Sequence, residues 1–435
     1  MEPLPEELLK LICDNLQPSG YTHLRQHDNA LLATLRNLSL SSKALRRIVQ
    51  PIMLHTLNFE KRPWSQVRSV LRLISRQPHL AHFVRKVIVA NWESYEPSKN
   101  EQTSSMSGMD VRVIRGLIKE LPLPQSLRRD LSAGINAGSK DAEFTTLLCF
   151  CTKLENINAQ LPGPLNNKLV KQCLSEAAES AGANSNFISF RRIQNVQLDG
   201  FPEVELSDIT EVLCLPALTT FDCYLLNHHR IKDLSTLCSS IKTLRLAFPV
   251  LREQSLEQLL CMCPNVTNLE LEWRFGFVSL VEDYGRWGDV LRKHGARLER
   301  LCFEVAEANM PNRQDLLPFG IMGDLSSLVR LKWLDVPFDS LCNSELPITE
   351  HLVLQNLLPL SLETLLVSSF ETRNTRSTTR DYLNTQLNKL IHDTRFMALK
   401  RICLDDVPKL KIRSQGTDWK LSRDINGWAE LNKHE

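Results

Sequence analysis

Cysteine and histidine carry the chemistry that is easiest to recognise from spacing alone. Four cysteines of this chain form two close pairs, Cys149-x-Cys151 and Cys261-x-Cys263. Tetrahedral zinc requires four ligands, commonly from two such pairs or from histidines. The adjacent His228 and His229 point in different directions and cannot easily share one ion. Each cysteine pair ends a predicted helix just ahead of a predicted strand, where a small apolar side chain fits a core, so we expect packing and no metal site.

Phosphate-binding and hydrolytic motifs are absent from the sequence. It contains no Gly-x-x-x-x-Gly-Lys loop, no Gly-x-Gly-x-x-Gly after a predicted strand, no His-Glu-x-x-His and no Gly-x-Ser-x-Gly. Glycine, which phosphate-cradling loops require, numbers only 16 in 435 residues. We therefore expect no catalytic residue and no cofactor. An enzyme with an unrecognised site remains an alternative.

The charge balance argues against a nucleic-acid partner. Lys plus Arg total 52 against 50 for Asp plus Glu, a net charge of +2, whereas binding nucleic acid usually needs a dominant basic face. The arginine doublets are far apart, with acidic residues between them: Arg46-Arg47, Arg128-Arg129 and Arg191-Arg192. We expect these doublets to be solvated surface.

The composition, 43% hydrophobic and 23% charged, is that of an ordinary folded protein. No stretch approaches the roughly 18 uncharged apolar residues that cross a bilayer, so we expect no membrane contact. The start, MEPLPEELLK, lacks the basic and apolar segments of a secretory signal. We expect the 12 scattered cysteines to be reduced, in a cytoplasmic and/or nuclear protein.

Residues 1–57 are predicted to form three short amphipathic helices. The first covers residues 4–16, with Pro5 in its first turn, where the missing N–H has no intrahelical partner in any case. Its apolar residues recur at helical spacing: Leu8, Leu9, Ile12 and Leu16.

Caps and a proline delimit the other two helices. Asp28 is placed to cap the second helix, and Ser41 or Ser42 the third. Pro51 should kink or restart the third helix because its ring clashes with the preceding turn. Three helices this short are marginal alone, so their apolar faces need a partner or the rest of the chain.

Short motif elements run through these helices, at Leu4-Pro5, Leu38-Ser39, Ser42-Lys43, Gln50-Pro51 and Leu54-His55. In this order they resemble the F-box, in the fungal-type form that precedes leucine-rich repeats. The resemblance implies docking on the Skp-type adaptor of an SCF ubiquitin ligase, and through it on a cullin ligase core. The implied adaptor-binding residues are Leu4, Pro5, Leu8, Leu9, Ile12, Leu38, Leu40, Leu45 and Ile48. A helical cap that only seals a repeat array is the alternative.

From residue 80 onward an apolar triplet recurs: one residue, a second three positions later and a third two beyond that. It occurs at Val84-Val87-Val89, Leu154-Ile157-Ala159, Ile193-Val196-Leu198, Leu218-Phe221-Cys223, Ile241-Leu244-Leu246, Val266-Leu269-Leu271, Leu298-Leu301-Phe303, Leu328-Leu331-Trp333, Leu362-Leu365-Val367 and Leu399-Ile402-Leu404. From Ile193 onward the starting points lie 23 to 37 residues apart. These periods run from the leucine-rich-repeat range to somewhat above it.

The triplets predict an α/β fold: a helical module at 1–57, then a leucine-rich-repeat-like solenoid at 58–435 with a parallel concave sheet and convex helices. Residues 251–264 and 285–295 have the helical spacing expected between strands. Polar stretches at about 91–110 and 371–381 are predicted to be loops. These repeats resemble those of F-box proteins. An α/β domain with several parallel strands is the alternative.

Outward strand positions define a predicted target-binding face. On each strand the residues two, four and six positions after the start of the triplet point away from the core. The candidates are Asn158, Gln197, Asp222, Tyr224, Arg245, Glu270, Glu272, Arg300, Glu304 and Lys332. They change from amides to carboxylates to basic groups along the chain, with Tyr224 as a candidate aromatic anchor. Ordinary polar coverage of a sheet is the alternative.

Together, the helices and the repeats predict a non-catalytic substrate-recognition adaptor of a cullin-type ubiquitin ligase, with a protein target of unknown identity. A leucine-rich-repeat scaffold that binds proteins without any connection to ubiquitin is the alternative function.

Overall fold

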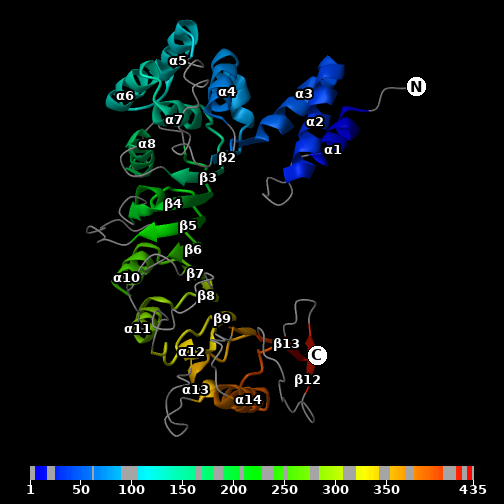
Figure 1. The fold of residues 1–435 in the computed structure, drawn as a ribbon, viewed down its shortest axis with the longest axis vertical. Helices are drawn as coiled ribbons and strands as arrows, with labels where there is room; N and C mark the ends of the chain where they lie inside the picture. The colour runs from blue at the N-terminus through cyan, green and yellow to red at the C-terminus, as the bar shows by residue number, and fades with distance from the viewer. Residues whose placement is uncertain are drawn as a thin grey trace. The chain divides into compact units, whose positions relative to one another are not determined.

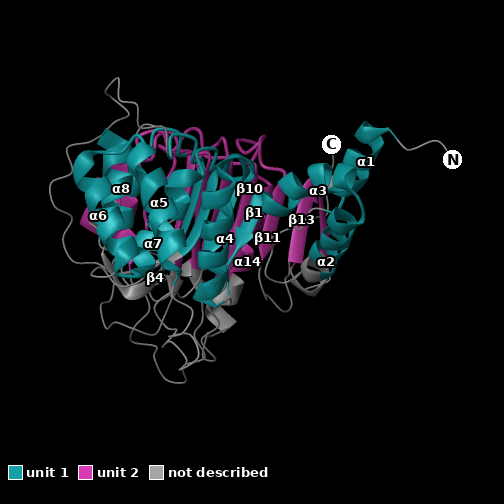
Figure 2. Cartoon of the chain, turned by 90° about the horizontal axis from the view of Figure 1, so that it is seen from above, with its two compact units in different colours: residues 1–204, 208–218 teal, residues 205–207, 219–435 magenta. Residues whose placement is uncertain are grey.

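The computed structural model describes residues 5–16, 25–60, 63–89, 106–161, 168–179, 190–205, 210–227, 240–248, 253–274, 284–306, 320–341, 353–368, 377–404, 418–423 and 429–433. The chain forms two compact units, one of residues 1–204 and 208–218, the other of residues 205–207 and 219–435 (Figure 2). The predicted division at residue 57 falls inside the first unit.

The first unit begins with three helices and continues with alternating strands and helices (Figure 1). Its elements are α1 (Glu6–Asp14), α2 (Arg25–Ser41), α3 (Lys43–His55), β1 (Thr56–Asn58), α4 (Trp64–Arg76), the 3-10 helix η2 (Pro78–Phe83), β2 (Lys86–Val89), α5 (Gly108–Glu120), α6 (Gln125–Asn136), α7 (Lys140–Phe150), β3 (Asn156–Leu161), α8 (Lys168–Glu179), β4 (Asn195–Glu205) and α9 (Thr210–Leu213).

The second unit also contains strands and helices. Its elements are β5 (Thr220–Asn227), β6 (Thr243–Phe248), α10 (Glu253–Met262), β7 (Asn268–Arg274), α11 (Tyr284–His294), β8 (Arg300–Ala306), β9 (Trp333–Pro337), α12 (Phe338–Leu341), α13 (Leu354–Leu357), β10 (Thr364–Ser368), α14 (Ser377–Ile391), β11 (Arg401–Leu404), β12 (Trp419–Arg423) and β13 (Ala429–Lys433).

Strands within each unit pair in the order of the sequence. In the first unit β1, β2, β3 and β4 pair in parallel, each with the next. In the second unit β5 to β11 do the same. Parallel neighbours in chain order require one crossover per repeat. Described helices lie in most of these crossovers, whereas between β5 and β6 and between β8 and β9 the described residues contain no helix. The predicted α/β class is confirmed, and this arrangement is compatible with a solenoid.

The apolar triplets form the core of both units. Apart from the repeat that contains β9, every predicted triplet residue is buried. Neighbouring strands align these residues in register, as Leu244 does with Phe221 on one side and Leu269 on the other. Burying an aliphatic side chain contributes about 1.5–3 kcal/mol, so three per repeat hold adjacent repeats together.

At β9 the predicted register is wrong by three residues. Trp333 is half-buried on the open side of the strand, whereas Leu334 and Val336 are fully buried. The triplet therefore starts at Leu331, not at Leu328. Both choices place leucines three apart, so the spacing alone did not distinguish them.

The series of buried apolar triplets also starts one repeat earlier than predicted. Leu54, Leu57 and Phe59 have the triplet spacing and are buried, and Leu57 aligns with Val87 across β1 and β2. Because α3 ends at His55 and β1 begins with the next residue, the helical segment joins the sheet without a linker.

The helices α1 to α3 surround a small apolar core of their own, made by Cys13, Leu35, Ile48 and Val49. Ser42 caps α3 as predicted, its hydroxyl accepting from the N–H of Leu45 at 3.1 Å. Asp28 lies inside α2, so its predicted role as a cap is wrong. α3 continues through Pro51, and the helix does not restart there.

Several predicted helices and loops have revised bounds. α10 lies within the stretch 251–264 that was predicted to be helical, and α11 begins one residue before the predicted stretch 285–295. α5 begins at Gly108, inside the predicted first loop. α14 begins at Ser377, so the end of the predicted second loop is helical. The remaining parts of these loops, 91–105 and 371–376, lie outside the described residues. No helix in the described ranges is long and apolar enough to cross a bilayer.

After β11 the pairing changes from parallel to antiparallel. β13 pairs with β11, and β12 pairs with β13. Arg401 and Glu430 form an ion pair of 2.5 Å across the junction. This hairpin was not predicted, because its short strands carry no apolar triplet.

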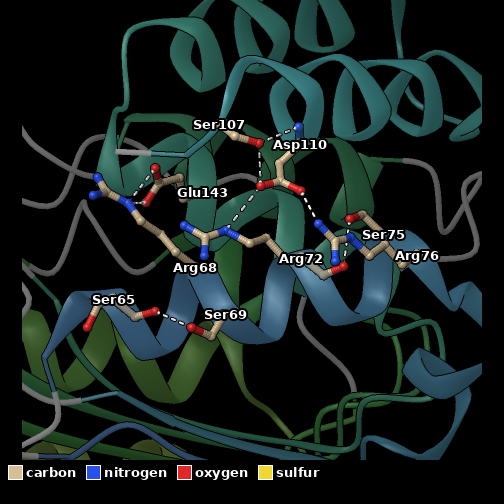
Figure 3. A network of polar contacts seen from close by, with 9 residues as sticks. All are labelled: Ser65, Arg68, Ser69, Arg72, Ser75, Arg76, Ser107, Asp110 and Glu143. Carbon is tan, nitrogen blue, oxygen red and sulfur yellow. Dashed lines mark hydrogen bonds and ion pairs between the residues drawn. The ribbon is translucent and has the colours of Figure 1, made fainter. Parts of the chain in front are cut away.

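An arginine stripe on α4 connects that helix to α5 and α7 (Figure 3). Arg68 reaches Glu143 of α7, and Arg72 and Arg76 reach Asp110 of α5, with N–O distances of 3.0, 3.4 and 2.8 Å. Both carboxylates are buried. Burial raises the pKa of Glu143, against the opposing hydrogen bonds from Arg68 and Trp64.

The pKa of Asp110, unlike that of Glu143, is lowered. The largest cause is the hydroxyl of Ser107, which donates a hydrogen bond to the carboxylate at 2.7 Å. Arg76 and Arg72 lower the pKa further, whereas burial acts in the opposite direction. A lowered folded-state pKa contributes stability that is present above the ordinary aspartate pKa of about 4 and is lost as the pH falls through the folded-state value.

We expect Asp110→Asn to lower the free energy of unfolding by about 2 kcal/mol at pH 7, because charge-assisted hydrogen bonds from Ser107 and Arg76 are weakened. Urea unfolding between pH 7 and pH 3 should show the difference from wild type shrinking as the pH drops below about 4. Asp130→Asn is the control, because its 3.8 Å contact with Arg129 is exposed and should matter by under about 0.5 kcal/mol. A difference that stays constant with pH would contradict this role.

Candidate functional site

The helix α1 carries two apolar stripes that face different ways. One packs on the core of the three helices and consists of Leu9 and Cys13, with Leu16 just after the helix. The other is exposed: Leu8, Leu11 and Ile12, at 46%, 60% and 51%. Positions i, i+3 and i+4 lie on one side of a helix, so these three side chains form a continuous surface, here called the exposed stripe.

The structure divides the predicted adaptor-binding residues into three groups. Leu8 and Ile12 lie in the exposed stripe, and Pro5 and Leu40 are exposed as well. Leu9, Leu38 and Leu45 are half-buried, the first two packing on the helical core. Ile48 is buried in that core, so its predicted docking role is wrong. Leu4 lies outside the described residues.

Leu11 was missed by the sequence analysis. It follows Leu8 by three residues and precedes Ile12 by one, and that spacing assigns it to the same side of α1. The prediction merged Leu8, Leu9, Ile12 and Leu16 into one stripe, whereas packing against α3 separates them.

In the first unit the open side of the sheet carries paired amides. Asn158 of β3 donates to Gln197 of β4 at 2.9 Å, and Asn195 donates to Asn156 at 2.7 Å. Each pair is directly in register. The predicted outward positions of Asn158 and Gln197 are therefore confirmed. Their amides are partly satisfied by each other.

In the second unit the open side carries a line of alternating charges across adjacent strands. Arg245 lies between Asp222 and Glu270, at 3.7 and 2.7 Å, and Glu270 also contacts Arg300 at 3.2 Å. The guanidinium of Arg300 then lies 4.7 Å from the ring centre of Trp333. Burial raises the pKa of Asp222, although Arg245 opposes it. We call these five residues the charge line.

Lys332, the last of the predicted target-binding residues, does not occupy an outward position on β9, because the predicted register of that strand is wrong by three residues. Lys332 precedes the strand, and its backbone bonds the neighbouring repeats at Glu299 and Glu363. The outward positions of β9 are Trp333 and Asp335 instead. The predicted change to basic groups late in the chain is therefore wrong for this repeat.

Further carboxylates lie on the described part of this face. Glu272 and Glu304 are directly in register on β7 and β8, beyond the charge line toward the ends of the strands. Tyr224 is half-buried at the corresponding end of β5. Glu272, Glu304 and Asp335 therefore add three carboxylates to the described part of this face.

No arrangement suited to metal binding is evident on either surface. Within the described ranges, no group of three or more His, Cys, Asp or Glu residues is placed to hold a metal ion. The predicted packing of the cysteine pairs is confirmed for Cys149, Cys151 and Cys263, which are buried, and is wrong for Cys261, which is exposed in the last turn of α10.

Comparison with known proteins supplies no family for this chain. No family model matches its sequence, and no curated protein is similar to it. The exposed stripe and the open face of the sheet are therefore interpreted from their own chemistry.

Glu270 should support the fold as well as the surface, because it is the acid that separates two arginines. We expect Glu270→Lys to lower the free energy of unfolding by roughly 2 kcal/mol, since it places three cations together. Chemical denaturation measures the effect. Glu304→Lys, at an exposed position on the next strand, should change stability by under about 0.5 kcal/mol. Equal effects of the two substitutions would show that the charge line is energetically irrelevant.

Proposed function

We propose that this chain is a substrate-recognition adaptor of an SCF-type ubiquitin ligase. The exposed stripe of α1 is the observation that carries the proposal. It would bind the Skp-type adaptor, and the open face of the sheet would bind a protein target. Catalysis would belong to the partner proteins.

The exposed stripe has the chemistry of a helix that inserts into a groove. Its three large apolar side chains are about half exposed on a helix of nine residues. Each would gain up to about 1.5–3 kcal/mol on full burial. Helix-in-groove recognition uses anchors at i, i+3 and i+4. The resemblance of residues 4–55 to the F-box supplies the class of partner.

The separate core of α1 to α3 supports the same function. Cys13, Leu35, Ile48 and Val49 keep the helices together without using the exposed stripe. The direct continuation of α3 into β1 gives the helices a firm attachment to the first strands. A ligase adaptor works by proximity, so it must hold its target near the partner proteins that carry out catalysis.

The face of the second unit favours a target with a basic surface. Glu272, Glu304 and Asp335 supply negative charge, and Tyr224 and Trp333 supply aromatic area. Aromatic side chains are common energetic centres of protein interfaces, and complementary charge speeds the encounter between partners.

A binding scaffold unconnected to ubiquitin is the second candidate. The open face of the sheet favours it equally, because that surface suits a protein partner whatever the role of α1. The two functions differ only in whether the exposed stripe binds a Skp-type adaptor.

We expect Leu8→Asp with Ile12→Asp to weaken binding to purified Skp-type adaptor at least tenfold, because two anchors are replaced by charges that must be desolvated. Binding is measured with the full chain by calorimetry. Circular dichroism should remain unchanged, since both side chains lie outside the core.

Val329→Asp with Leu360→Asp is the matched control, because both residues are exposed apolar side chains of the second unit. This pair should leave the affinity unchanged. If the wild-type chain does not bind the adaptor, the ligase function is wrong and the scaffold function takes its place.

For the target face, Glu272→Lys with Glu304→Lys should reduce capture of basic targets in affinity purification with mass spectrometry, because two carboxylates of the face are replaced by cations. The matched control is Glu120→Lys with Asp130→Lys on α5 and α6. An unchanged set of captured proteins would remove this face as the target site.

A further inference from the structure

The helices α5 and α6 pack side by side and leave an open groove on their outer side (Figure 1). A short connection at 121–124 joins them, and α6 runs back along α5. Both helices bury apolar residues on their inner side, such as Ile118 of α5 and Leu131 of α6. The groove between their polar sides has a volume of about 500 Å³. We call it the basic groove, because four of its lining residues are cations: Arg115, Lys119, Arg128 and Arg129.

Helical spacing brings these cations together. Arg115 and Lys119 are four residues apart on α5, and Arg128 and Ser132 are four apart on α6. Residues at this spacing lie on the same side of a helix, so each helix contributes one polar stripe. In the part of the chain that the structure describes, no carboxylate lines the groove.

The cations of the basic groove lack the acidic partners that other cations of this chain have. Arg72 and Arg76 contact the buried Asp110, for example. Among the described residues, by contrast, Arg115, Lys119 and Arg128 have no carboxylate within ion-pair distance, and Arg129 has only an exposed contact of 3.8 Å with Asp130. Like charges so close together repel one another. A cleft lined by one sign of charge concentrates ions of the opposite sign.

Hydrogen bonds hold two of the guanidinium groups in place. Nη1 of Arg128 donates to the backbone carbonyl of Lys119 at 2.8 Å, and Nη1 of Arg115 donates to Oδ1 of Asn136 at 3.5 Å. A guanidinium has five N–H donors, so each arginine retains donors for a ligand. Paired N–H donors of a guanidinium match the spacing of two phosphate oxygens.

The doublet Arg128-Arg129 was predicted to be solvated surface. Arg129 is exposed, as predicted, whereas Arg128 is half-buried between the helices. The prediction is therefore wrong for Arg128, because its role in joining α6 to the end of α5 depends on a contact that the local sequence does not show.

We propose that the basic groove binds small anions that contain a chain of linked phosphates, such as inorganic tripolyphosphate or the phosphate tail of a nucleoside triphosphate. The volume of the groove falls within the roughly 300–1,000 Å³ of small-ligand sites. Four cations in that space match a compact ion with several negative charges. The groove has no aromatic lining residue on which a base would stack, so the phosphate chain is the part recognised. This binding is independent of the proposed ligase role.

The test is titration calorimetry of the full chain with inorganic tripolyphosphate, without divalent metal ions and at about 0.15 M salt, where exposed charges are largely screened. We expect one ion to bind per chain. Arg115→Gln with Lys119→Gln should weaken the affinity at least about tenfold, because two charge-assisted contacts are lost. The matched control is Lys43→Gln with Arg46→Gln, which removes two exposed cations one turn apart on α3 and should leave the affinity unchanged.

Failure of tripolyphosphate to bind the wild-type chain would overturn the proposal. Equal losses of affinity in the two double variants would also overturn it, because they would report only the net charge. Binding of a single strand of about ten nucleotides more tightly than tripolyphosphate would overturn it too, because the groove would then belong to a longer polyanion. ATP identifies the source of the phosphates. Affinity equal to that of tripolyphosphate supports recognition of the phosphate chain alone, and tighter binding that the α5 variant loses supports a nucleoside triphosphate.

Ser132→Asp keeps the test decisive if circular dichroism shows that the α5 variant has lost structure. This substitution removes no cation and places a carboxylate among the four. With circular dichroism unchanged, an affinity at least about tenfold weaker supports the proposal, because the carboxylate repels the anion and pairs with its cations. A wild-type affinity would overturn it.

Discussion

A β-strand points alternate side chains to opposite faces, and both units of this chain are built on that constraint. Once the residues three and five positions after the start of each triplet are buried, those at two and four must face the open side. The register between neighbouring strands applies the same inward and outward positions to each strand, because a shift by one residue would expose every apolar side chain. The core and the candidate target face are therefore two consequences of one pattern.

The open face also shows how the chain distributes charge. Arg245 and Arg300 are each in contact with Glu270, so the cations of this face serve the sheet itself. The arginines of α4 do the same for two buried carboxylates. Beyond the charge line, the described part of this face also carries the acids Glu272 and Glu304 and the aromatic ring of Tyr224.

The helix α1 carries more apolar side chains than the three helices can bury. Nine residues carry two apolar stripes, and three short helices can bury only one of them. The core of Cys13, Leu35, Ile48 and Val49 accounts for the first stripe. The second, on Leu8, Leu11 and Ile12, has no counterpart in the helical core, which is the physical reason to connect it with a partner protein.

The spacing of apolar residues by itself determined the class of fold, the order of the strands and nearly all of the buried triplet residues, because burial on a strand follows a fixed period. It also placed Asn158, Gln197, Arg245 and Glu270 on the open face. Packing decided the rest. The choice between Leu328 and Leu331 depended on alignment with the neighbouring strands, and it moved Lys332 off the face and Trp333 onto it. Only contact with α3 separated Leu9 from Leu8, and only the packing of α6 against α5 brought Asn136 to Arg115, since no local pattern encodes a contact between residues 21 positions apart.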